Sequence, residues 1–501
     1  MGSLVHKKTL KIEKLLKEKK ESFWIKRGEK SVLECFKEAK QIPAYKDFLK
    51  RENYKIPAIK TILDFKLLPM PSKSNYLRSY PFDKLFIKNQ FVDIPRVFSA
   101  TSGSTGEPFY FPRTEIQDKQ YQIYAELYLR NNFNIHKKKT LYIDAFPMGP
   151  WIGGVFTYEV ITRIARESQY PLSIITTGID TASIIKTVKK MGQYYDQIII
   201  GAYGPFTKDI LDTGIDEGIN WRQYNIKFIF SAEAFPESFR DYVGNIVGSK
   251  NIFLDTLNHY GTVDLGTMSY ETPICILIRK LAEKNKFLYK KIFGDTIKIP
   301  TLTQYLPELF YFESVNGNLY CTSESAIPLI RYNLEDRGNV IGFNEMKSIF
   351  KEVNIDLLKE AQKCNIQESI WELPFVYVFE RSDFSVSYYA FQVYPGPIRK
   401  ILLQKDVQKK VTGKFTMESG FSWKQNPQLV VSIELKKNIL PSKQLSKNIT
   451  KLVHNQLLKT HSEYRETVNH FGTKAHVSVI LLENGNQEHF KSGTKQKWIK
   501  K

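Results

Sequence analysis

QIIIGAYGPFTKDILDTGIDEGINWRQYNIKFIF, the segment at residues 197–230, decides the fold class of this chain. It starts and ends with short apolar runs, QIII at 197–200 and IKFIF at 226–230, and such runs are typical of buried strands. Between them, residues 205–217 carry apolar side chains at helical spacing. Two strands with a helix between them predict one unit of an α/β sheet.

The same alternation continues on the N-terminal side of this segment. Residues 140–143 and 172–176 are further strand candidates, and residues 181–194 are a further helix candidate. The alternation predicts an α/β domain with a largely parallel sheet. Sheets of this kind bind ligands in the loops beyond the carboxyl ends of their strands, so functional residues are expected there.

The two ends of the chain have a different character from this core, which we place at residues 96–380. Residues 1–95 carry apolar stripes in a lysine-rich background, which predicts a helical N-terminal segment of the large domain. Residues 381–501 predict a small α+β domain. Around and within it, the element candidates are strands at 375–379, 429–433 and 476–481, a helix at 440–458 and a basic tail from Phe490 to Lys501.

Composition limits the class of protein. The 501 residues suit two or three domains, and 42% hydrophobic residues are enough for sizeable cores. The four scattered cysteines exclude a disulfide scaffold and a standard structural zinc site, and they fit a reducing compartment. No apolar stretch reaches the ~18 residues of a membrane span, and no signal peptide is recognisable. We therefore expect a cytoplasmic protein without a membrane partner.

The formal net charge of +21 allows two interpretations. It could mark a protein that binds nucleic acid or an anionic membrane surface. However, lysine dominates over arginine and is spread along the whole chain, whereas nucleic-acid readers favour arginine. A solvated lysine-rich surface is the favoured interpretation, and no nucleic-acid partner is expected.

The strongest local signal is the loop Ala100-Thr101-Ser102-Gly103-Ser104-Thr105-Gly106-Glu107-Pro108. Its glycines allow tight turns, and its hydroxyl and N–H groups can surround phosphate oxygens. It is neither a Walker loop nor a nucleophile elbow, because the Gly-Lys-Ser/Thr ending and the first glycine of the elbow are missing. Taken alone, it is equally explained as a surface turn.

The loop resembles the phosphate-binding signature of adenylate-forming enzymes, and the wider sequence resembles their phenylacetate–CoA ligase branch. Four further segments follow in that family's order and approximate spacing, which makes a chance match of all five improbable. They are Ser231-Ala232-Glu233-Ala234-Phe235, Asn258-His259-Tyr260-Gly261-Thr262-Val263-Asp264, Pro328-Leu329-Ile330-Arg331-Tyr332-Asn333-Leu334-Glu335-Asp336, and the stretch from Glu380-Arg381-Ser382-Asp383 to Ile398.

This resemblance implies an acid–thiol ligase of the AMP-forming type that uses ATP and Mg²⁺. A carboxylic acid, for which an aromatic acid is one candidate, would attack ATP to give an acyl-adenylate and pyrophosphate. A thiol would then take the acyl group. The resemblance implies CoA as this acceptor, while a carrier-protein thiol or an amine stays open as an alternative.

The resemblance also implies roles for individual residues. Thr101, Ser102, Gly103, Ser104, Thr105 and Gly106 would bind phosphate, while Glu233, Tyr260, Gly261, Asp336 and Arg381 would bind adenine and ribose. Asp264 would help to hold Mg²⁺ in place of the family's glutamate. Ordinary alternatives remain: a turn cap for Asp336, a surface ion pair for Arg381 and a core position for Tyr260.

Two further residues would serve the movement and the chemistry of the reaction. Asp383 would be the hinge about which a mobile C-terminal domain pivots, and Lys495 would enter the site for adenylation, where its ammonium offsets the repulsion between two anions. Lys495 could instead belong to a disordered basic tail, and Lys497 is the fallback by register.

The acyl pocket has four candidate residues, Trp151, Tyr203, Gly204 and His259. The first three belong to segments that follow predicted strands and combine aromatic side chains with glycine, which suits a pocket wall or an ordinary packing loop. His259 has no paired ligand in the sequence, which favours a structural or pocket role over a metal site.

Several positions depart from the family pattern. Glu107 stands where many relatives carry lysine, and Ala390 replaces the glycine that admits the pantetheine thiol. A degenerate ligase fold that binds nucleic acid or an anionic surface would explain these changes together with the charge. This alternative predicts salt-sensitive binding to generic DNA and no pyrophosphate release with any acid.

Overall fold

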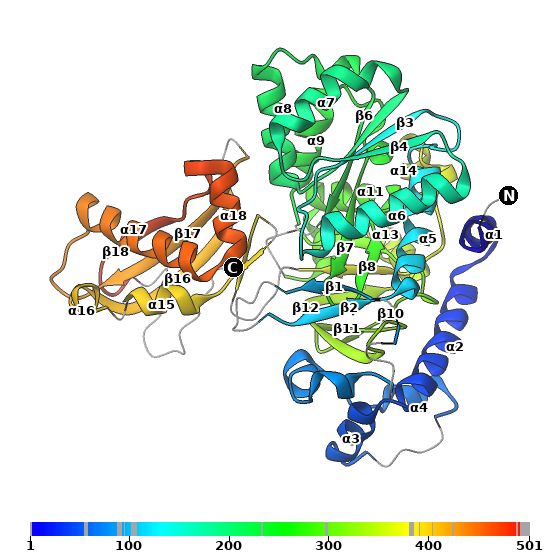
Figure 1. Cartoon of the computed structure of the whole chain (residues 1–501), viewed down its shortest axis with the longest axis horizontal. Helices are drawn as coiled ribbons and strands as arrows, with labels where there is room; N and C mark the ends of the chain where they lie inside the picture. Colours follow the sequence, from blue (N-terminus) through cyan, green and yellow to red (C-terminus); the bar gives the residue numbers. More distant parts are fainter. Residues whose placement is uncertain are drawn as a thin grey trace. The chain divides into compact units, whose positions relative to one another are not determined.

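The computed structural model describes residues 3–54, 59–87, 93–94, 96–101, 108–231, 234–295, 299–379, 385–389, 391–402, 404–422, 425–486 and 489–490. The chain divides into two compact units (Figure 1). The larger unit comprises Met1–Ser99, Tyr110–Gly204 and Asp209–Phe379, and the smaller comprises Ala100–Phe109, Pro205–Lys208 and Glu380–Lys501.

The N-terminal part of the larger unit is helical, as the sequence predicted. Ser3 caps the first helix by accepting a hydrogen bond from the backbone N–H of His6. Pro43, which interrupts the apolar pattern, occupies the first position of a new helix, where its missing N–H costs nothing. The helices are α1 (Leu4–Glu18), α2 (Glu21–Ala39), α3 (Pro43–Arg51) and α4 (Ile62–Lys66).

The centre of the larger unit is a mixed sheet that has eleven strands in the described part of the chain. Its parallel half confirms the α/β prediction and contains, in spatial order, β4 (Leu172–Thr176), β3 (Thr140–Asp144), β5 (Gln197–Gly201), β6 (Ile226–Ser231) and β7 (Thr256–Thr262). Strands β3, β5 and β6 are buried on both faces, which is why their sequences are mainly apolar runs, whereas the edge strand β4 is largely exposed.

The other half of the sheet is antiparallel, so the parallel region is narrower than predicted. The change occurs after β7, because the short turn that follows it can only return the chain as an antiparallel neighbour. The antiparallel strands continue in the spatial order β8 (Gly266–Tyr270), β9 (Thr301–Gln304), β13 (Phe375–Val378), β12 (Leu329–Ile341), β11 (Asn318–Ser323) and β10 (Tyr311–Val315).

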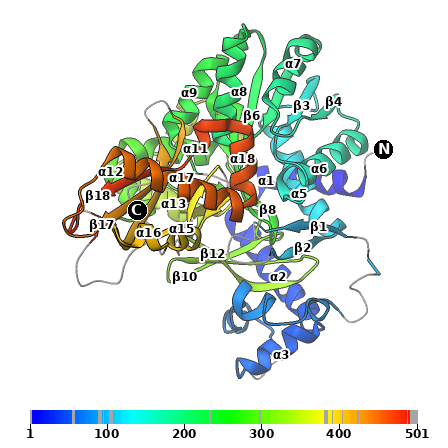
Figure 2. The same cartoon turned by 60° about the vertical axis from the view of Figure 1, so that its left-hand side comes forward.

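Helices cover both faces of the parallel half. Figure 2 shows α6 (Ile152–Ser168) and α7 (Thr181–Met191) on opposite sides of β3 and β4. Helix α5 (Glu115–Asn131) packs beside α6 and is buried over almost its whole length. The remaining helices are α8 (Gly204–Asp216), of which Pro205–Lys208 belong to the smaller unit, α9 (Glu237–Val247), α10 (Ile252–Asp255), α11 (Pro273–Lys284), α12 (Lys286–Phe293), α13 (Phe343–Glu352) and α14 (Leu357–Lys363).

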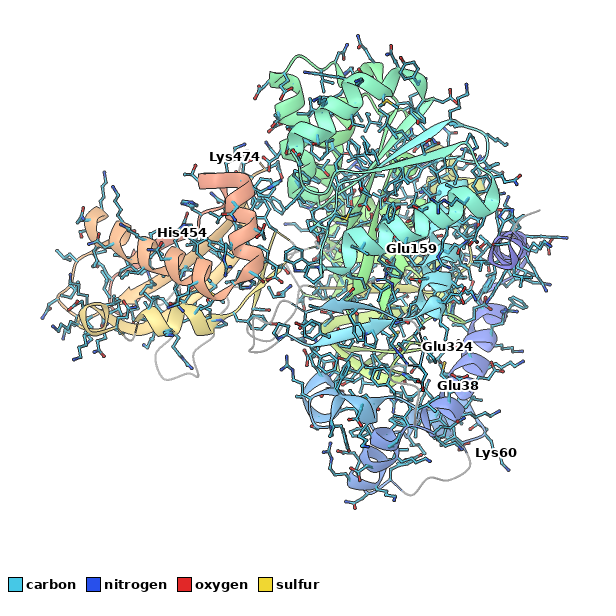
Figure 3. All side chains as sticks on the ribbon, in the orientation of Figure 1. Glu38, Lys60, Glu159, Glu324, His454 and Lys474 are labelled. Carbon is cyan, nitrogen blue, oxygen red and sulfur yellow. The ribbon has the colours of Figure 1, made fainter. Side chains whose placement is uncertain are left out.

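The smaller unit has its own sheet and its own apolar core. Strand β17 (Pro427–Leu435) lies between β16 (Val411–Phe421) and β18 (Ser478–Leu482), and it pairs in parallel with β18. Helix α17 (Lys443–Thr460) closes the core with Ile449, Val453 and Leu457, and it carries His454, labelled in Figure 3. The other elements are α15 (Pro395–Leu402), α16 (Lys405–Gln408), α18 (Ser462–Phe471), β14 (Val386–Tyr388) and β15 (Phe391–Val393).

All four cysteines are free thiols, as expected for a chain without a disulfide scaffold. Within the described residues, no helix combines the length and the apolar character needed to cross a membrane. Exposed lysines occur in both units, as Lys60 and Lys474 illustrate in Figure 3, which agrees with the spread of lysine along the sequence.

Candidate functional site

The carboxyl ends of β3, β5, β6 and β7 lie at one edge of the sheet. The register pairs Asp144 of β3 with Gly201 of β5, and Ser231 of β6 with His259 of β7. The loops that follow these strands contain Trp151, Tyr203, Gly204 and Asp264, while His259, Tyr260 and Gly261 lie at the end of β7 itself. The topology of the parallel half therefore gathers them on one edge, as expected for an α/β sheet.

Tyr260 and Asp336 are in direct contact. The Tyr260 hydroxyl donates a hydrogen bond of 2.7 Å to Asp336 Oδ2, and both side chains are buried. Tyr260 lies in β7 and Asp336 in β12, which are not neighbours in the sheet. The ring of Tyr260 stacks on Phe312 of β10, with 6.0 Å between ring centroids. Two residues that the sequence assigned to adenine and ribose are thus held together by the fold itself.

Asp264 is held in a similar way. It lies in the turn between β7 and β8, and its Oδ2 accepts a hydrogen bond of 2.6 Å from the hydroxyl of Tyr332 in β12. Its Oδ1 lies 3.7 Å from the ammonium nitrogen of Lys73, and only 5% of the Asp264 side chain is exposed. Strand β12 therefore carries one of the two predicted carboxylates, Asp336, and holds the other, Asp264, through the hydroxyl of Tyr332.

Lys73 is a candidate site residue that the sequence reasoning missed. It begins a short π-helix (Lys73–Leu77), which Ser72 caps by accepting a hydrogen bond from Asn75. Besides approaching Asp264, its ammonium group lies 5.6 Å from the ring centroid of Phe111 in β2 (Tyr110–Arg113). The available signal in the sequence was a lysine two residues after the stretch Pro69-Met70-Pro71.

Asp264 fits a magnesium ion only in the company of other ligands. Within the described residues, no group of three or more His, Cys, Asp or Glu side chains could hold a metal. Mg²⁺ usually binds one or two carboxylates and takes its remaining ligands from phosphates and water. A single buried carboxylate matches that pattern for a nucleotide-bound ion.

The predicted phosphate loop joins β1 (Val97–Ala100) and β2, which form a two-stranded sheet. Thr101 closes the base of this hairpin, since its backbone N–H donates to the carbonyl of Phe109 over 3.0 Å and its Oγ1 accepts the Phe109 N–H over 2.9 Å. The rest of the loop, Ser102, Gly103, Ser104, Thr105 and Gly106, lies outside the described residues, as do Glu233, Arg381, Asp383 and Lys495.

Gly261 has a structural reason to be glycine. A Cβ atom at this position would lie 2.6 Å from the carbonyl oxygen of Gly266 on the neighbouring strand. A side chain would therefore force β7 and β8 apart at the point where their register shifts.

The candidate acyl-pocket residues do not all gather in one place. Tyr203 packs against Phe146, with 5.6 Å between ring centroids, and a Cβ on Gly153 would lie 3.6 Å from the Tyr203 hydroxyl oxygen. Trp151 is the half-buried residue before the first turn of α6. Gly204 instead faces α9, where a Cβ would lie 3.4 Å from the ring of Phe239.

His259, the fourth candidate, packs against helix α5. Its ring centroid lies 5.1 Å from that of Tyr128 and 6.0 Å from that of Tyr121. Burial lowers the pKa of His259 to about 3, so its imidazole is neutral at neutral pH.

A fully buried network of ionic groups contacts the backbone at Phe235, and no pattern in the sequence indicated it. Arg279 donates to the carbonyl oxygen of Phe235 over 2.5 Å and pairs with Glu271 at 2.7 Å and with Glu237 at 2.9 Å. Arg240 pairs with the same two glutamates at 2.8 Å. Because each buried charge has opposite charges within hydrogen-bond distance, the network fixes the backbone at Phe235.

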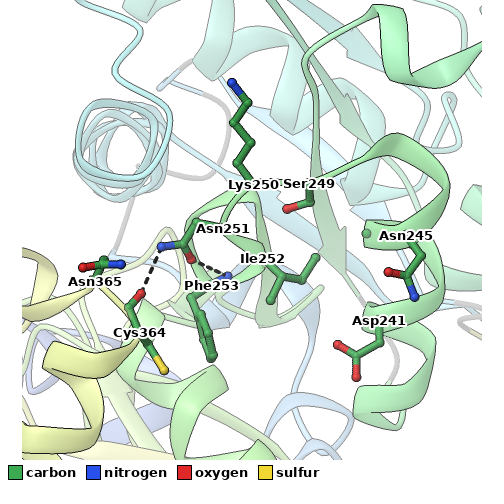
Figure 4. A pocket seen from close by; sticks show the side chains of 10 residues that line it. Asp241, Asn245, Ser249, Lys250, Asn251, Ile252, Phe253, Cys364 and Asn365 are labelled. Carbon is green, nitrogen blue, oxygen red and sulfur yellow. Dashed lines mark hydrogen bonds between the residues drawn. The ribbon is translucent and has the colours of Figure 1, made fainter.

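A separate pocket of about 340 Å³ lies at the other edge of the sheet, near the amino end of β7 (Figure 4). Its side chains are mainly polar, and Asn251 donates to the carbonyl oxygen of Cys364 over 3.1 Å. It contains none of the residues predicted from the sequence, so we do not consider it the active site. Its lining residues are Asp241, Gly244, Asn245, Ser249, Lys250, Asn251, Ile252, Phe253, Cys364 and Asn365.

Comparison with known proteins identifies the fold. No family model matches the sequence, and no curated protein matches it. A 2-hydroxyisobutyryl-CoA ligase, solved with 2-HIB-AMP and CoA in the thioesterification state, aligns over 96% of this chain and 89% of that chain, with a TM-score of 0.61 and 13% identity. The same ligase in an open conformation aligns over 94% and 91%, with a TM-score of 0.51 and 13% identity. This chain therefore has the fold of adenylate-forming ligases.

Proposed function

We propose that this protein uses ATP to activate a carboxylic acid and then transfers the acyl group to the thiol of CoA. One observation carries the proposal: Tyr260 and Asp336 are hydrogen-bonded to each other at the two positions that match the family's adenine and ribose motifs. In the first step the carboxylate attacks the α-phosphorus of ATP, which gives an acyl-adenylate and releases pyrophosphate. In the second step the thiol attacks the acyl carbon, and AMP leaves.

Asp336 binds the ribose hydroxyls in this proposal. An ionised carboxylate accepts about four hydrogen bonds, so the bond from Tyr260 leaves room for two ribose hydroxyls. Tyr260 has a double role, because its hydroxyl fixes Asp336 while the edge or free face of its ring packs on adenine. Glu233, Gly261 and Arg381 complete the nucleoside site.

The phosphates are bound by Thr101, Ser102, Gly103, Ser104, Thr105 and Gly106, together with Lys73. The position of Lys73 beside Asp264 supports this role, because a cation is needed where Glu107 replaces the lysine of the family loop. Asp264 would hold Mg²⁺, which supplies charge neutralisation of the phosphates when bound. Lys73 then serves as a second, permanent positive charge.

Lys495 is the catalytic residue in this proposal. The attacking carboxylate and the α-phosphate are both anionic, and an ammonium group between them stabilises the charge that develops as they approach. The small unit turns about Asp383, which brings Lys495 in for adenylation and removes it before thiol attack.

The acid is bound at the carboxyl edge of the parallel strands. Tyr203 and Phe146 offer aromatic surface there, which supports an aromatic acid and the phenylacetate–CoA ligase branch. Trp151, Gly204 and His259 are the further candidates for this pocket. CoA is the favoured acceptor, and a carrier-protein thiol or an amine stays open as an alternative.

ATP–pyrophosphate exchange across a panel of carboxylic acids tests this proposal. Exchange that depends on an acid is the expected result, and Lys495→Ala should slow it by about 10²-fold or more. Lys497→Ala is the matched control and should have a milder effect. Salt-sensitive binding to generic DNA without acid-dependent exchange would instead favour a degenerate ligase that binds nucleic acid.

A further inference from the structure

Towards the carboxyl ends of the parallel strands, three polar side chains on one face of the sheet are buried without full hydrogen bonding. Tyr142 and Asp144 belong to β3, His259 belongs to β7, and their exposed fractions are 0%, 0% and 5%. Within the described residues, Tyr142 Oη, Asp144 Oδ2 and His259 Nε2 have no hydrogen-bond partner. Buried polar groups are almost always satisfied, so three such atoms on one face require an explanation.

These residues share a face because side chains alternate along a strand. Tyr142 and Asp144 are two residues apart and therefore point to the same side of β3. His259 lies on this side as well, because it packs against Tyr121 and Tyr128 of α5. Tyr121 is also a neighbour of Tyr142, whose pKa is raised by burial first and by Tyr121 second. Helix α5 thus covers a layer rich in polar groups.

The Asp144 carboxyl is the group in this layer that lacks the most of the hydrogen bonds it could form. Its Oδ1 accepts one long hydrogen bond of 3.3 Å, from the backbone N–H of Phe146. Its Oδ2 accepts none, and among the described residues no lysine or arginine is found paired with it. Burial raises the pKa of Asp144 well above its usual range. A hydrogen bond from any donor that reaches a carboxyl in this state stabilises it strongly.

Asp144 adjoins the proposed acyl pocket through its neighbours. Phe146 is two residues further along the chain and packs against Tyr203. On the adjacent strand, a Cβ at Gly201 would lie 2.5 Å from Tyr142 Oη and 2.9 Å from Phe146 Cε2. Only glycine leaves room at this position for both groups, so the Tyr142 hydroxyl and the aromatic wall meet beside Asp144.

We propose that Asp144 and Tyr142 determine the specificity of the enzyme by binding a hydrogen-bond donor on the acyl chain of the acid. The donor is a hydroxyl or an amino group, so the enzyme takes a polar-substituted acid rather than a hydrocarbon one. This inference rests on the proposed function, since it assigns the substrate class of that reaction. A hydroxyl bonds to the carboxyl directly, whereas an ammonium group forms an ion pair with ionised Asp144.

Pyrophosphate exchange with matched sets of acids tests the inference. Each set keeps one carbon skeleton, aromatic or aliphatic, and places a methyl, a hydroxyl or an amino group at the same position. The wild-type protein should favour a hydroxyl or amino acid over its methyl partner by about 10- to 100-fold. The member that is favoured identifies which donor the site binds.

Variants of Asp144 and Tyr142 test whether these residues cause the substrate preference. Asp144→Leu should abolish or reverse it, and Asp144→Asn should keep a preference for a hydroxyl but lose one for an amine, because an amide cannot form the ion pair. Tyr142→Phe removes only a hydroxyl and should weaken the preference without loss of folding. Tyr158→Phe, on the exposed side of α6, is the control and should change nothing.

Failure of the inference differs from failure of the proposed function. Equal exchange with the methyl partner, or a preference that survives undiminished in Asp144→Leu, would overturn the inference and leave acid activation intact. No exchange with any acid would overturn both.

Discussion

The hydroxyl of Tyr260 lies 2.7 Å from Asp336 Oδ2, although the two residues are 76 positions apart in the chain. The bond connects the end of the parallel half of the sheet with a strand deep in its antiparallel half. It orients the Asp336 carboxylate without a nucleotide. A carboxylate that is already oriented loses less conformational entropy when it binds ribose, which favours affinity.

Asp336→Ala should weaken ATP binding by about 1.5–3 kcal/mol, the scale of a hydrogen bond to a charged group. Isothermal titration calorimetry with ATP measures this loss. Tyr260→Phe is the informative companion, because it keeps the ring and the carboxylate but removes the bond between them, and its effect should be smaller. An Asp336→Ala protein with wild-type ATP affinity would remove Asp336 from the site.

Lys73→Met should lower the kcat/KM of pyrophosphate exchange by about 10- to 100-fold, because it removes a cation held beside Asp264. The assay is exchange measured over a range of magnesium concentrations. Lys60→Met is the matched control, since Lys60 is exposed and should be silent. If Lys73→Met were equally silent, Lys73 would be only a structural partner of Asp264.

Arg279→Met should destabilise the larger unit by about 3–5 kcal/mol, because it leaves the buried Glu271 and Glu237 without one of their two arginines. Denaturant unfolding measures the change. Lys291→Met is the control, because its partner Glu352 is exposed and the loss should stay below about 1 kcal/mol. Equal losses in both variants would contradict the view that burial makes the arginine network strong.

Stability should depend on pH through His259. Its pKa falls from 6.5 to about 3 on folding, so between these values the unfolded chain binds a proton that the folded chain does not. This contribution to stability is therefore complete above about pH 6.5 and is lost as the pH falls towards 3, by at most about 1.4 kcal/mol per pH unit.

The measurement is unfolding in a series of buffers across this window, for the wild-type protein and for His259→Gln. The variant should show a shallower pH slope, because glutamine does not titrate. Identical slopes would mean that His259 accepts its proton in the folded state as easily as in the unfolded state.

Local patterns in the sequence were sufficient for much of the fold. Strands β3 to β6 are continuous apolar runs, and α7 and α8 between them have clear helical spacing, so both could be predicted from neighbouring residues alone. The antiparallel half is harder to predict. Thr301–Gln304, for example, is a short run with polar residues on a buried strand, and its burial depends on partners that are distant in sequence.

The candidate site depends even more on distant contacts. The resemblance to a known family singled out Tyr260, Asp264 and Asp336, but no pattern in the sequence predicted that Tyr332 and Lys73 would contact Asp264. Asp144 ends a strand that was predicted, yet its lack of partners becomes visible only when α5 is placed over that face. Spacing assigns a residue to an element, whereas the three-dimensional fold decides what it contacts.

The fate of the oxygen atoms of the acid tests the central claim most directly. The protein is given ATP, CoA and an acid that supports exchange, with the carboxylate labelled with heavy oxygen, and the nucleotide product is analysed by mass spectrometry. If the carboxylate attacks the α-phosphorus, one labelled oxygen stays on the phosphate when the thiol releases AMP, so the product is AMP with one label. Unlabelled AMP, or ADP in place of AMP, would contradict the account.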